Sequence, residues 1–159
     1  MTMDSQAVQN PLLKVEDLKH SFLDGGARVR ALRGVSFEAR RGQVTAIVGP
    51  SGCGKSTLLY LLGLLDRPES GEILLDNRPV AKASDEKRTA LRNESIGFVF
   101  QFHFLIKELS ARENVALPLR KSGVGEGEAL SQAEDLLDKL GMGEKAKRFA
   151  NKLSGGEQQ

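Results

Sequence analysis

Apolar and polar positions alternate near the start of the chain in a way that predicts two neighbouring strands. Residues 12–22 alternate in character, which is typical of an edge strand with one buried face. Residues 24–26, Asp-Gly-Gly, supply the backbone freedom that a tight hairpin needs. A second extended stretch follows over residues 29–39, with an interruption at Arg33-Gly34. The pattern therefore predicts a hairpin, preceded by a tail over residues 1–11.

Three shorter apolar runs predict further strands. Residues 44–48 are β-branched at four of five positions and are flanked by glycines, which indicates a buried strand. A second buried strand is predicted over residues 95–100, and a short strand over residues 72–76. Strands thus dominate the expected structure before residue 101.

Helical patterns interrupt these strands and then replace them. Helices are predicted over residues 55–65 and 84–92. Ser110, followed three residues later by Glu113, forms a capping box that opens a helix toward residue 119. A last helix ends at Gly141, after a loop over residues 122–127. Its apolar positions share one face and are Leu130, Ala133, Leu136, Leu137 and Leu140.

Composition narrows the class of protein. The 159 residues, 40% hydrophobic and 28% charged, suit one globular domain or a slightly larger one. The longest apolar run covers residues 58–65, well short of the ~20 residues that a membrane span needs. A polar start and a single cysteine predict a soluble intracellular protein. A net charge of +2 and the lack of tryptophan argue against a nucleic-acid partner.

A glycine-rich segment carries the clearest chemistry. Residues 49–56, Gly-Pro-Ser-Gly-Cys-Gly-Lys-Ser, match G-x-x-x-x-G-K-[ST] between a predicted strand and a predicted helix. Such glycines let successive N–H groups face one phosphate at a helix N-terminus. Lys55 would bridge the β- and γ-phosphates, Ser56 would coordinate Mg²⁺ and Thr57 would reach the α-phosphate. The expected nucleotide-binding residues are Gly49, Pro50, Ser51, Gly52, Cys53, Gly54, Lys55, Ser56 and Thr57.

Cys53 allows two interpretations. It is either a small residue that the loop tolerates, or a thiol that Lys55 and the helix N-terminus activate toward alkylation. The sequence favours neither interpretation over the other.

The end of the sequence indicates which kind of phosphate-loop protein this is. Residues 153–159 read Leu-Ser-Gly-Gly-Glu-Gln-Gln, so that Ser154 and Glu157 can cap a helix. Together with the phosphate loop, this segment resembles the signature of ATP-binding-cassette (ABC) ATPases. The resemblance covers residues 12–159. It implies that Ser154, Gly155, Gly156 and Glu157 face an ATP held by a second subunit.

Two more residues match positions that ABC ATPases use at the nucleotide. Gln101 follows a predicted strand, as does the family's glutamine that contacts Mg²⁺ and the attacking water. Phe22 matches an aromatic residue that stacks on adenine, although tyrosine is commoner there. The resemblance therefore implies Lys55 and Gln101 as catalytic residues and Ser56 and Gln101 as Mg²⁺ ligands.

Within the family, residues 98–105 and 113–119 are most similar to ATPase subunits of lipoprotein-releasing transporters. These share a subgroup with macrolide-export and cell-division cassettes. The resemblance implies ATP-driven transport with ATP and Mg²⁺ as cofactors. It also implies a homodimer and a membrane-spanning partner subunit that docks on residues 102–119. The expected location is the cytoplasm, at the inner face of the cell membrane.

The resemblance stops before the second acidic motif and the switch histidine that ABC ATPases need. Residues 73–76, Ile-Leu-Leu-Asp, resemble that acidic motif but precede Gln101, so we interpret Asp76 as part of a turn. The predicted fold is an α/β P-loop core with an antiparallel β-subdomain and a helical insert, truncated at its C-terminus. The core and β-subdomain are expected over residues 12–101 and the helical subdomain over 102–159. Alone, the 159 residues are expected to be inactive in hydrolysis.

Two alternatives stay open. One is a non-transport ABC ATPase, such as those of DNA repair or chromosome organisation, although their coiled-coil or zinc inserts are not visible in this sequence. The other is a nucleotide-binding module without turnover.

Overall fold

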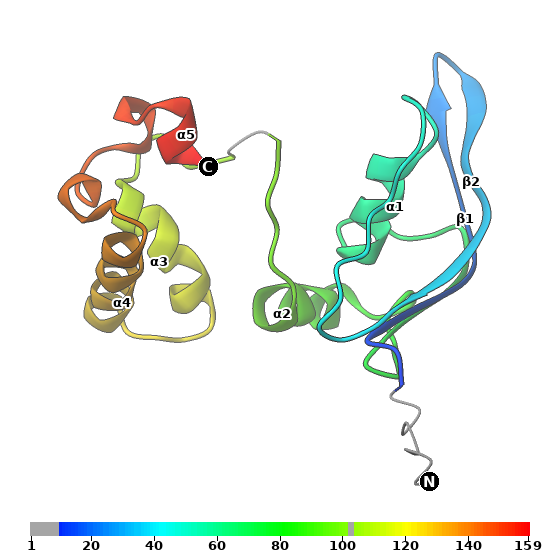
Figure 1. Cartoon of the computed structure of the whole chain (residues 1–159), viewed down its shortest axis with the longest axis horizontal. Helices are drawn as coiled ribbons and strands as arrows, with labels where there is room; N and C mark the ends of the chain where they lie inside the picture. The colour runs from blue at the N-terminus through cyan, green and yellow to red at the C-terminus, as the bar shows by residue number, and fades with distance from the viewer. Residues whose placement is uncertain (1–9, 102–103) are drawn as a thin grey trace, which may run out of the picture. The chain divides into compact units, whose positions relative to one another are not determined.

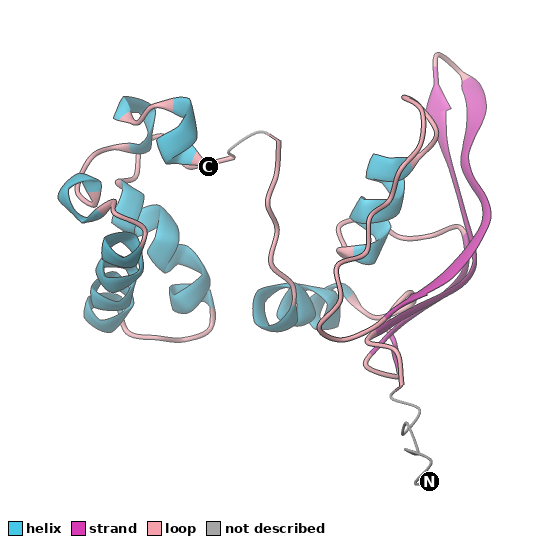
Figure 2. Ribbon diagram, in the orientation of Figure 1, coloured by secondary structure: helices cyan, strands magenta, loops and turns pink. Residues whose placement is uncertain are grey.

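The computed structural model describes residues 10–101 and 104–159, which form two compact units. The first unit ends at Ile96 and combines a sheet with helices, whereas the second begins at Gly97 and is helical (Figures 1 and 2). Among the described residues, the first unit has one buried apolar cluster and the second has two. None of the helices in the described part has the length and apolar content that crossing a bilayer requires.

The first unit is built on a four-stranded antiparallel sheet in the order β2-β1-β3-β4. The predicted Asp-Gly-Gly turn is confirmed, since it joins the first two strands. β1 pairs with strands on both sides, so the prediction of an edge strand over residues 12–22 is wrong. The bounds of the strands are β1 Leu13–Asp24, β2 Ala27–Ala39, β3 Ser70–Leu75 and β4 Arg78–Pro79.

β2 continues through the predicted interruption at Arg33-Gly34, but its pairing with β1 is irregular there. Extra residues at Ala31 and Gly34 have no partner on β1 and form bulges. Gly34 has a φ of 108°, and a Cβ at this position would lie 2.7 Å from Asp17 Oδ1. The second bulge therefore requires glycine.

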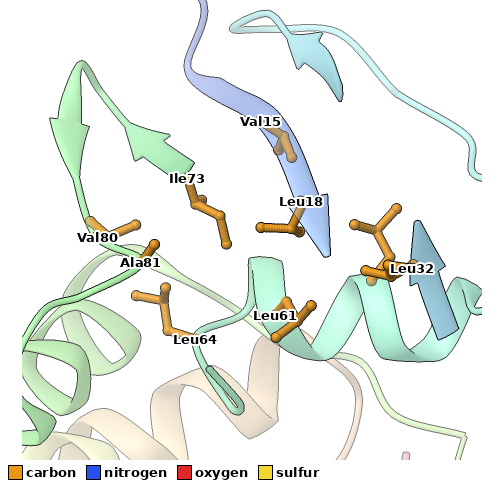
Figure 3. Packing of buried hydrophobic residues seen from close by; sticks show 9 residues of the cluster. Val15, Leu18, Leu32, Leu61, Leu64, Ile73, Val80 and Ala81 are labelled. Carbon is orange, nitrogen blue, oxygen red and sulfur yellow. The ribbon is translucent and has the colours of Figure 1, made fainter. Parts of the chain in front are cut away.

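Helix α1 (Lys55–Leu62) packs across one face of this sheet. Leu61 of the helix and Leu64 just beyond it lie among apolar side chains of the strands (Figure 3), and Leu58 belongs to the same buried cluster. The helix ends three residues earlier than expected, because Gly63 caps it and Leu64 has a φ of 57°. The other buried members of this cluster are Val15, Leu18, Leu32, Ile73, Val80 and Ala81.

Helix α2 (Asp85–Ser95) supplies donors to the backbone that follows α1. Arg88 is 5% exposed, and its Nη2 donates to the carbonyl oxygens of Leu64 at 2.8 Å and Asp66 at 2.7 Å. Arg92 Nη1 donates to the Leu64 oxygen at 2.7 Å. The two arginines thus satisfy carbonyl groups of the turn that follows α1.

The two buried strands predicted over residues 44–48 and 95–100 are wrong for this structure. Neither segment pairs with a strand in the described ranges. Val44 is 100% exposed, and Val48 and Val99 are each 86% exposed. A strand needs a neighbour that satisfies its N–H and C=O groups, so β-branched composition alone does not produce one.

Short side chains allow the two longer helices of the second unit to pack closely. Ala116 of α3 and Ala129 and Ala133 of α4 are completely buried in one cluster. The predicted capping box at the start of α3 is confirmed, with Ser110 N–H donating to Glu113 Oε2 at 2.7 Å. The elements of this unit are α3 Ala111–Lys121, α4 Glu126–Lys139, the 3₁₀ turns η1 Gly143–Lys145 and η2 Ala150–Lys152, and α5 Gly155–Gln158.

The apolar face predicted for the last long helix is only partly correct. Ala133 and Leu137 are buried as expected, but Leu136 and Leu140 are 47% and 78% exposed. The buried stripe instead continues to Ala129, at intervals of four residues. Leu130, also predicted for this face, is partly buried and packs against the same cluster.

The short helix α5 is anchored through one carboxylate. Glu157 Oε2 accepts a hydrogen bond from the N–H of Ser154 at 2.8 Å, which confirms the predicted cap. Its Oε1 lies 2.5 Å from Nζ of Lys145, at the end of η1. The Lys145 ammonium and then the Ser154 N–H lower the pKa of Glu157 from 4.5 to about 2.

Replacing Arg88 with leucine is expected to lower the free energy of unfolding of the first unit by about 1.5–3 kcal/mol, because buried carbonyl groups lose charged donors. Urea unfolding followed by the fluorescence of Tyr60, the single tyrosine of the chain, measures this loss. The control is Arg78→Leu, an exposed position expected to change stability by less than ~0.5 kcal/mol. Equal losses in both variants would contradict a special role for Arg88.

The carboxyl group of Glu157 is expected to titrate near pH 2. Because its pKa is lowered in the folded state, its stabilisation of α5 is complete above about pH 4.5 and is lost as the pH falls through about 2. NMR titration of the side-chain carbonyl carbon measures the midpoint, and Lys145→Met should move it up toward 4.5. A midpoint that Lys145→Met leaves unchanged would rule out the ammonium as the main cause.

Candidate functional site

The phosphate-loop sequence forms a tight turn that leads directly into α1. Gly52 and Gly54 have φ values of 78° and 95°, a left-handed conformation that favours glycine. Gly54 is the N-cap of the helix, and a Cβ on it would lie 2.6 Å from the carbonyl oxygen of Ala31. The loop therefore lies against β2, at a distance that no side chain permits.

Lys55 folds back over the loop that precedes it. Its Nζ donates to the carbonyl oxygens of Gly49 at 2.9 Å and Pro50 at 2.7 Å. The sulfur of Cys53 lies 3.8 Å from the same nitrogen. A positive charge is thus fixed beside the first turn of α1, where backbone N–H groups also favour an anion. Cys53 is exposed beside the ammonium, and both interpretations of this residue stay open.

A cavity of about 290 Å³ joins this loop to the hairpin. Phe22 and Val29 face each other across β1 and β2 at one part of the lining, and Lys55 lies at another. The cavity therefore offers both an apolar surface and a cation. Its lining consists of Phe22, Val29, Arg30, Ala31, Ser51, Gly52, Gly54, Lys55, Ser56 and Thr57.

Most of the expected nucleotide-binding residues of the first unit meet at this cavity. Gly49, Pro50 and Cys53 belong to the same loop but do not line the cavity. Val29, Arg30 and Ala31 line it without having been predicted. The Asp-Gly-Gly turn was a usable signal for Val29, because the hairpin register that it sets brings this residue opposite Phe22.

The other predicted site residues lie in the second unit. Gln101 is exposed in a bend, and residues 154–156 are exposed at the N-terminus of α5. A Cβ on Gly156 would meet no atom within 4 Å. How Gln101 and the signature residues lie relative to the phosphate loop stays a prediction. Phe102 and His103, which begin the expected docking segment, lie outside the described residues.

Asp76 occupies the turn between β3 and β4, as predicted. Its φ is 51°, and its Oδ1 accepts a hydrogen bond from Arg41 Nη2 at 2.7 Å. The carboxylate is therefore paired within the β-subdomain.

The donor groups suit magnesium held mainly by phosphate. Across residues 10–101 and 104–159, no cluster of three or more His, Cys, Asp or Glu side chains could hold a metal ion. Ser56 offers a hydroxyl oxygen at the cavity, and Gln101 carries an amide oxygen. Mg²⁺ prefers oxygen ligands and is commonly held by one or two protein groups, waters and substrate phosphates. The Ser56 hydroxyl therefore fits an ion that arrives with a nucleotide, and a contact from Gln101 stays a prediction.

Comparison with known sequences identifies close relatives. The family model "ABC transporter" matches residues 32–159. The Lipoprotein-releasing system ATP-binding protein LolD of Bordetella pertussis is 46% identical over 149 residues, which cover 94% of this chain and 64% of that protein. LolD of Paramagnetospirillum magneticum is 42% identical over 152 residues, which cover 96% of this chain and 67% of that protein. The chain thus spans about two thirds of the length of these relatives.

Solved structures show the same fold. A dimeric ATP-binding cassette in a post-hydrolysis state, bound to ADP and Pi, superposes with a TM-score of 0.83 at 35% identity, over 92% of this chain and 65% of that chain. CbiO1 of Clostridium perfringens, part of the ABC transporter complex cbiONQ, superposes with a TM-score of 0.74 at 33% identity. This match covers 94% of the present chain and 58% of CbiO1. The expected α/β P-loop fold of the ABC type is thereby confirmed. From the family match and the phosphate-loop geometry together, we conclude that this chain belongs to the ABC transporter family.

Proposed function

We propose that the chain binds ATP with Mg²⁺ in the 290 Å³ cavity and forms the ATP-binding part of an ABC transporter ATPase. The observation that carries this proposal is the placement of the Lys55 ammonium and the Phe22 ring in one cavity at the N-terminus of α1. The whole protein would couple ATP binding and hydrolysis to transport. The names of the relatives support lipoprotein release, or a related export, as the process.

The triphosphate would bind where Lys55 now bonds to its own loop. Of the three acceptors around Nζ, the Cys53 sulfur is the most distant and the weakest. A phosphate oxygen can take its place while both carbonyl contacts persist. The hydroxyls of Ser56 and Thr57 line the same cavity and can donate to further phosphate oxygens. The positive end of α1 adds to the attraction.

The adenine base would lie against Phe22. This ring is 45% exposed, and Val29, opposite it, is 39% exposed, so both present apolar surface to the cavity. A flat base can stack on the ring with a favourable free energy of about 1–3 kcal/mol. Phenylalanine provides stacking alone, without the hydroxyl that tyrosine would bring.

Magnesium would be held by the phosphates, Ser56 and Gln101. When bound, it neutralises phosphate charge and orients the triphosphate. The side chains act by position: the Ser56 hydroxyl follows directly after Lys55, and Gln101 would bring its amide oxygen from the second unit. We assign catalytic roles to Lys55, whose ammonium would contact the phosphates, and to Gln101, whose amide oxygen would contact the ion.

The signature segment would act on the ATP of a second copy. Ser154, Gly155 and Gly156 are exposed, and the lack of a side chain at Gly156 leaves room for a phosphate. The solved relatives include dimeric cassettes, which supports a homodimer in which Glu157 helps to hold this segment. Residues 102–119 would contact a membrane-spanning subunit, placing the protein at the cytoplasmic face of the membrane.

Replacing Lys55 with alanine is expected to weaken MgATP binding about 10- to 150-fold, the loss typical of a charged hydrogen bond of about 1.5–3 kcal/mol. Titration calorimetry on the chain measures this change. Lys82→Ala removes the same charge at an exposed position outside the cavity and should bind as the unchanged chain does. ATP affinity that survives Lys55→Ala intact would refute the site.

Replacing Phe22 with alanine is expected to weaken ATP binding about 5- to 150-fold, as expected for a stacking free energy of about 1–3 kcal/mol. Inorganic tripolyphosphate, which has no base, should bind to this variant as it does to the unchanged chain. Competition titrations with both ligands separate the two contributions, and Phe22→Tyr serves as the control that keeps the ring. If both ligands lose affinity equally, Phe22 does not contact the base.

A further inference from the structure

The antiparallel sheet carries a second hollow, of about 370 Å³, that the proposed nucleotide site does not use. Its charged and hydroxyl side chains include Lys19, Ser21, Arg28, Arg30, Arg33 and Glu69, which we call the basic recess. Four cations and one carboxylate meet here, although the whole chain has a net charge of only +2. The positive charge is therefore concentrated at this place.

The bulge at Ala31 places two of these arginines on the same face of the sheet. Ser21 pairs with Arg30 and Lys19 pairs with Arg33, so that two steps along β1 correspond to three along β2. Side chains of directly paired residues lie on the same face. Without the extra residue, the regular alternation would turn Arg33 to the opposite face.

The first bulge reverses which residues of β2 face the recess, and the second bulge, at Gly34, limits this reversed alternation to a short segment. Beyond it, Leu18 pairs with Val35, and the alternation of the rest of β2 is restored. In the reversed segment Leu32 is buried in the apolar cluster and also borders the basic recess, and Arg33 lines the recess. Bulges commonly re-aim side chains at functional sites. Here the two bulges determine which side chains of β2 lie in the apolar core and which line the recess.

Local carboxylates neutralise only part of the recess. Glu69 forms an ion pair with Arg28 and accepts a hydrogen bond from the Ser21 hydroxyl at 2.9 Å. Lys19 lies 2.7 Å from Asp17. Within residues 10–101 and 104–159, Arg30 and Arg33 have no ion pair with a carboxylate. Arg30 also lies close enough to Glu69 for its charge to lower the pKa of that carboxyl group. The four cations thus face two carboxylates, Glu69 and Asp17, which leaves a net positive charge for a ligand.

We propose that the basic recess binds a phosphate group of two negative charges through Arg30 and Arg33. Planar guanidinium groups bind phosphate oxygens in pairs, and two arginines that form no ion pair with a carboxylate in the described residues match a dianion. Ser70 also lines the recess and adds a hydroxyl. The recess is larger than the 290 Å³ nucleotide cavity, so the phosphate can carry further atoms. Its source is either a small soluble phosphate compound or the headgroup of an anionic lipid.

Titration calorimetry with inorganic pyrophosphate tests this proposal. We expect two classes of sites in the unchanged chain, one of which disappears in Lys55→Ala. In that Lys55→Ala background, Arg33→Gln should weaken the remaining class by about tenfold or more, as the loss of a charged hydrogen bond predicts. Adding Arg30→Gln to the Lys55→Ala/Arg33→Gln variant should abolish pyrophosphate binding. Of these two cavities, Arg33 lines the recess alone, whereas Arg30 lines both. Arg33→Gln therefore tests the recess separately from the nucleotide cavity.

The control is Arg40→Gln/Arg78→Gln, which removes two positive charges at exposed positions of the same unit outside the recess. It should bind pyrophosphate in the Lys55→Ala background without a change. Thermal melting by circular dichroism checks that each variant folds. A loss as large in the control as in Arg30→Gln/Arg33→Gln would overturn the proposal, because general charge would then explain it.

A second measurement identifies the source of the phosphate. Flotation with phosphatidylcholine vesicles that contain phosphatidic acid is compared between the unchanged chain and Arg33→Gln. Binding that depends on Arg33 assigns the recess to lipid, and Arg33-dependent pyrophosphate binding without vesicle binding assigns it to a soluble phosphate. If neither probe depends on Arg33, the proposal is wrong. If the unchanged chain shows the Arg33-dependent class of sites but no class that Lys55→Ala removes, the proposed nucleotide site is refuted and the proposal for the recess holds.

Discussion

The first unit depends on the packing of α1 against the antiparallel sheet. Leu61 of the helix and Leu18 of β1 are completely buried in this contact. The same helix begins at Lys55, directly after a glycine that lies too close to Ala31 for any side chain. One packing interface therefore holds the core together and brings the phosphate loop beside the hairpin. A change that shifts α1 would alter stability and the nucleotide cavity together.

Features set by local chemistry were predictable from the sequence. The Asp-Gly-Gly turn, the Ser110–Glu113 cap and the start of α1 at Lys55 follow from residues only a few positions apart. Strands depend on partners elsewhere in the chain, so the β-branched composition of residues 44–48 did not produce one. For the same reason alternation alone did not show that β1 lies inside the sheet.

The candidate site was predictable to different degrees. The phosphate-loop residues follow from spacing, and Phe22 was expected only from family resemblance, yet the hairpin register places it at the cavity. Arg30 and the basic recess were missed, because the bulges at Ala31 and Gly34 break the alternation on which the prediction relied. Gln101 lies in the second unit, and its role depends on geometry between units that local patterns do not encode.

The charge on α5 raises a physical problem for the proposed signature site, which the structure resolves. Glu157, with a pKa of about 2, is ionised at neutral pH and would repel the phosphate that this segment is proposed to approach. Lys145, 2.5 Å from the carboxylate, balances this negative charge. The carboxylate also occupies the Ser154 N–H and holds a helix of four residues, too short to persist alone. The ion pair with Lys145 thus lets the ionised carboxylate order the segment without leaving an unbalanced negative charge beside Ser154.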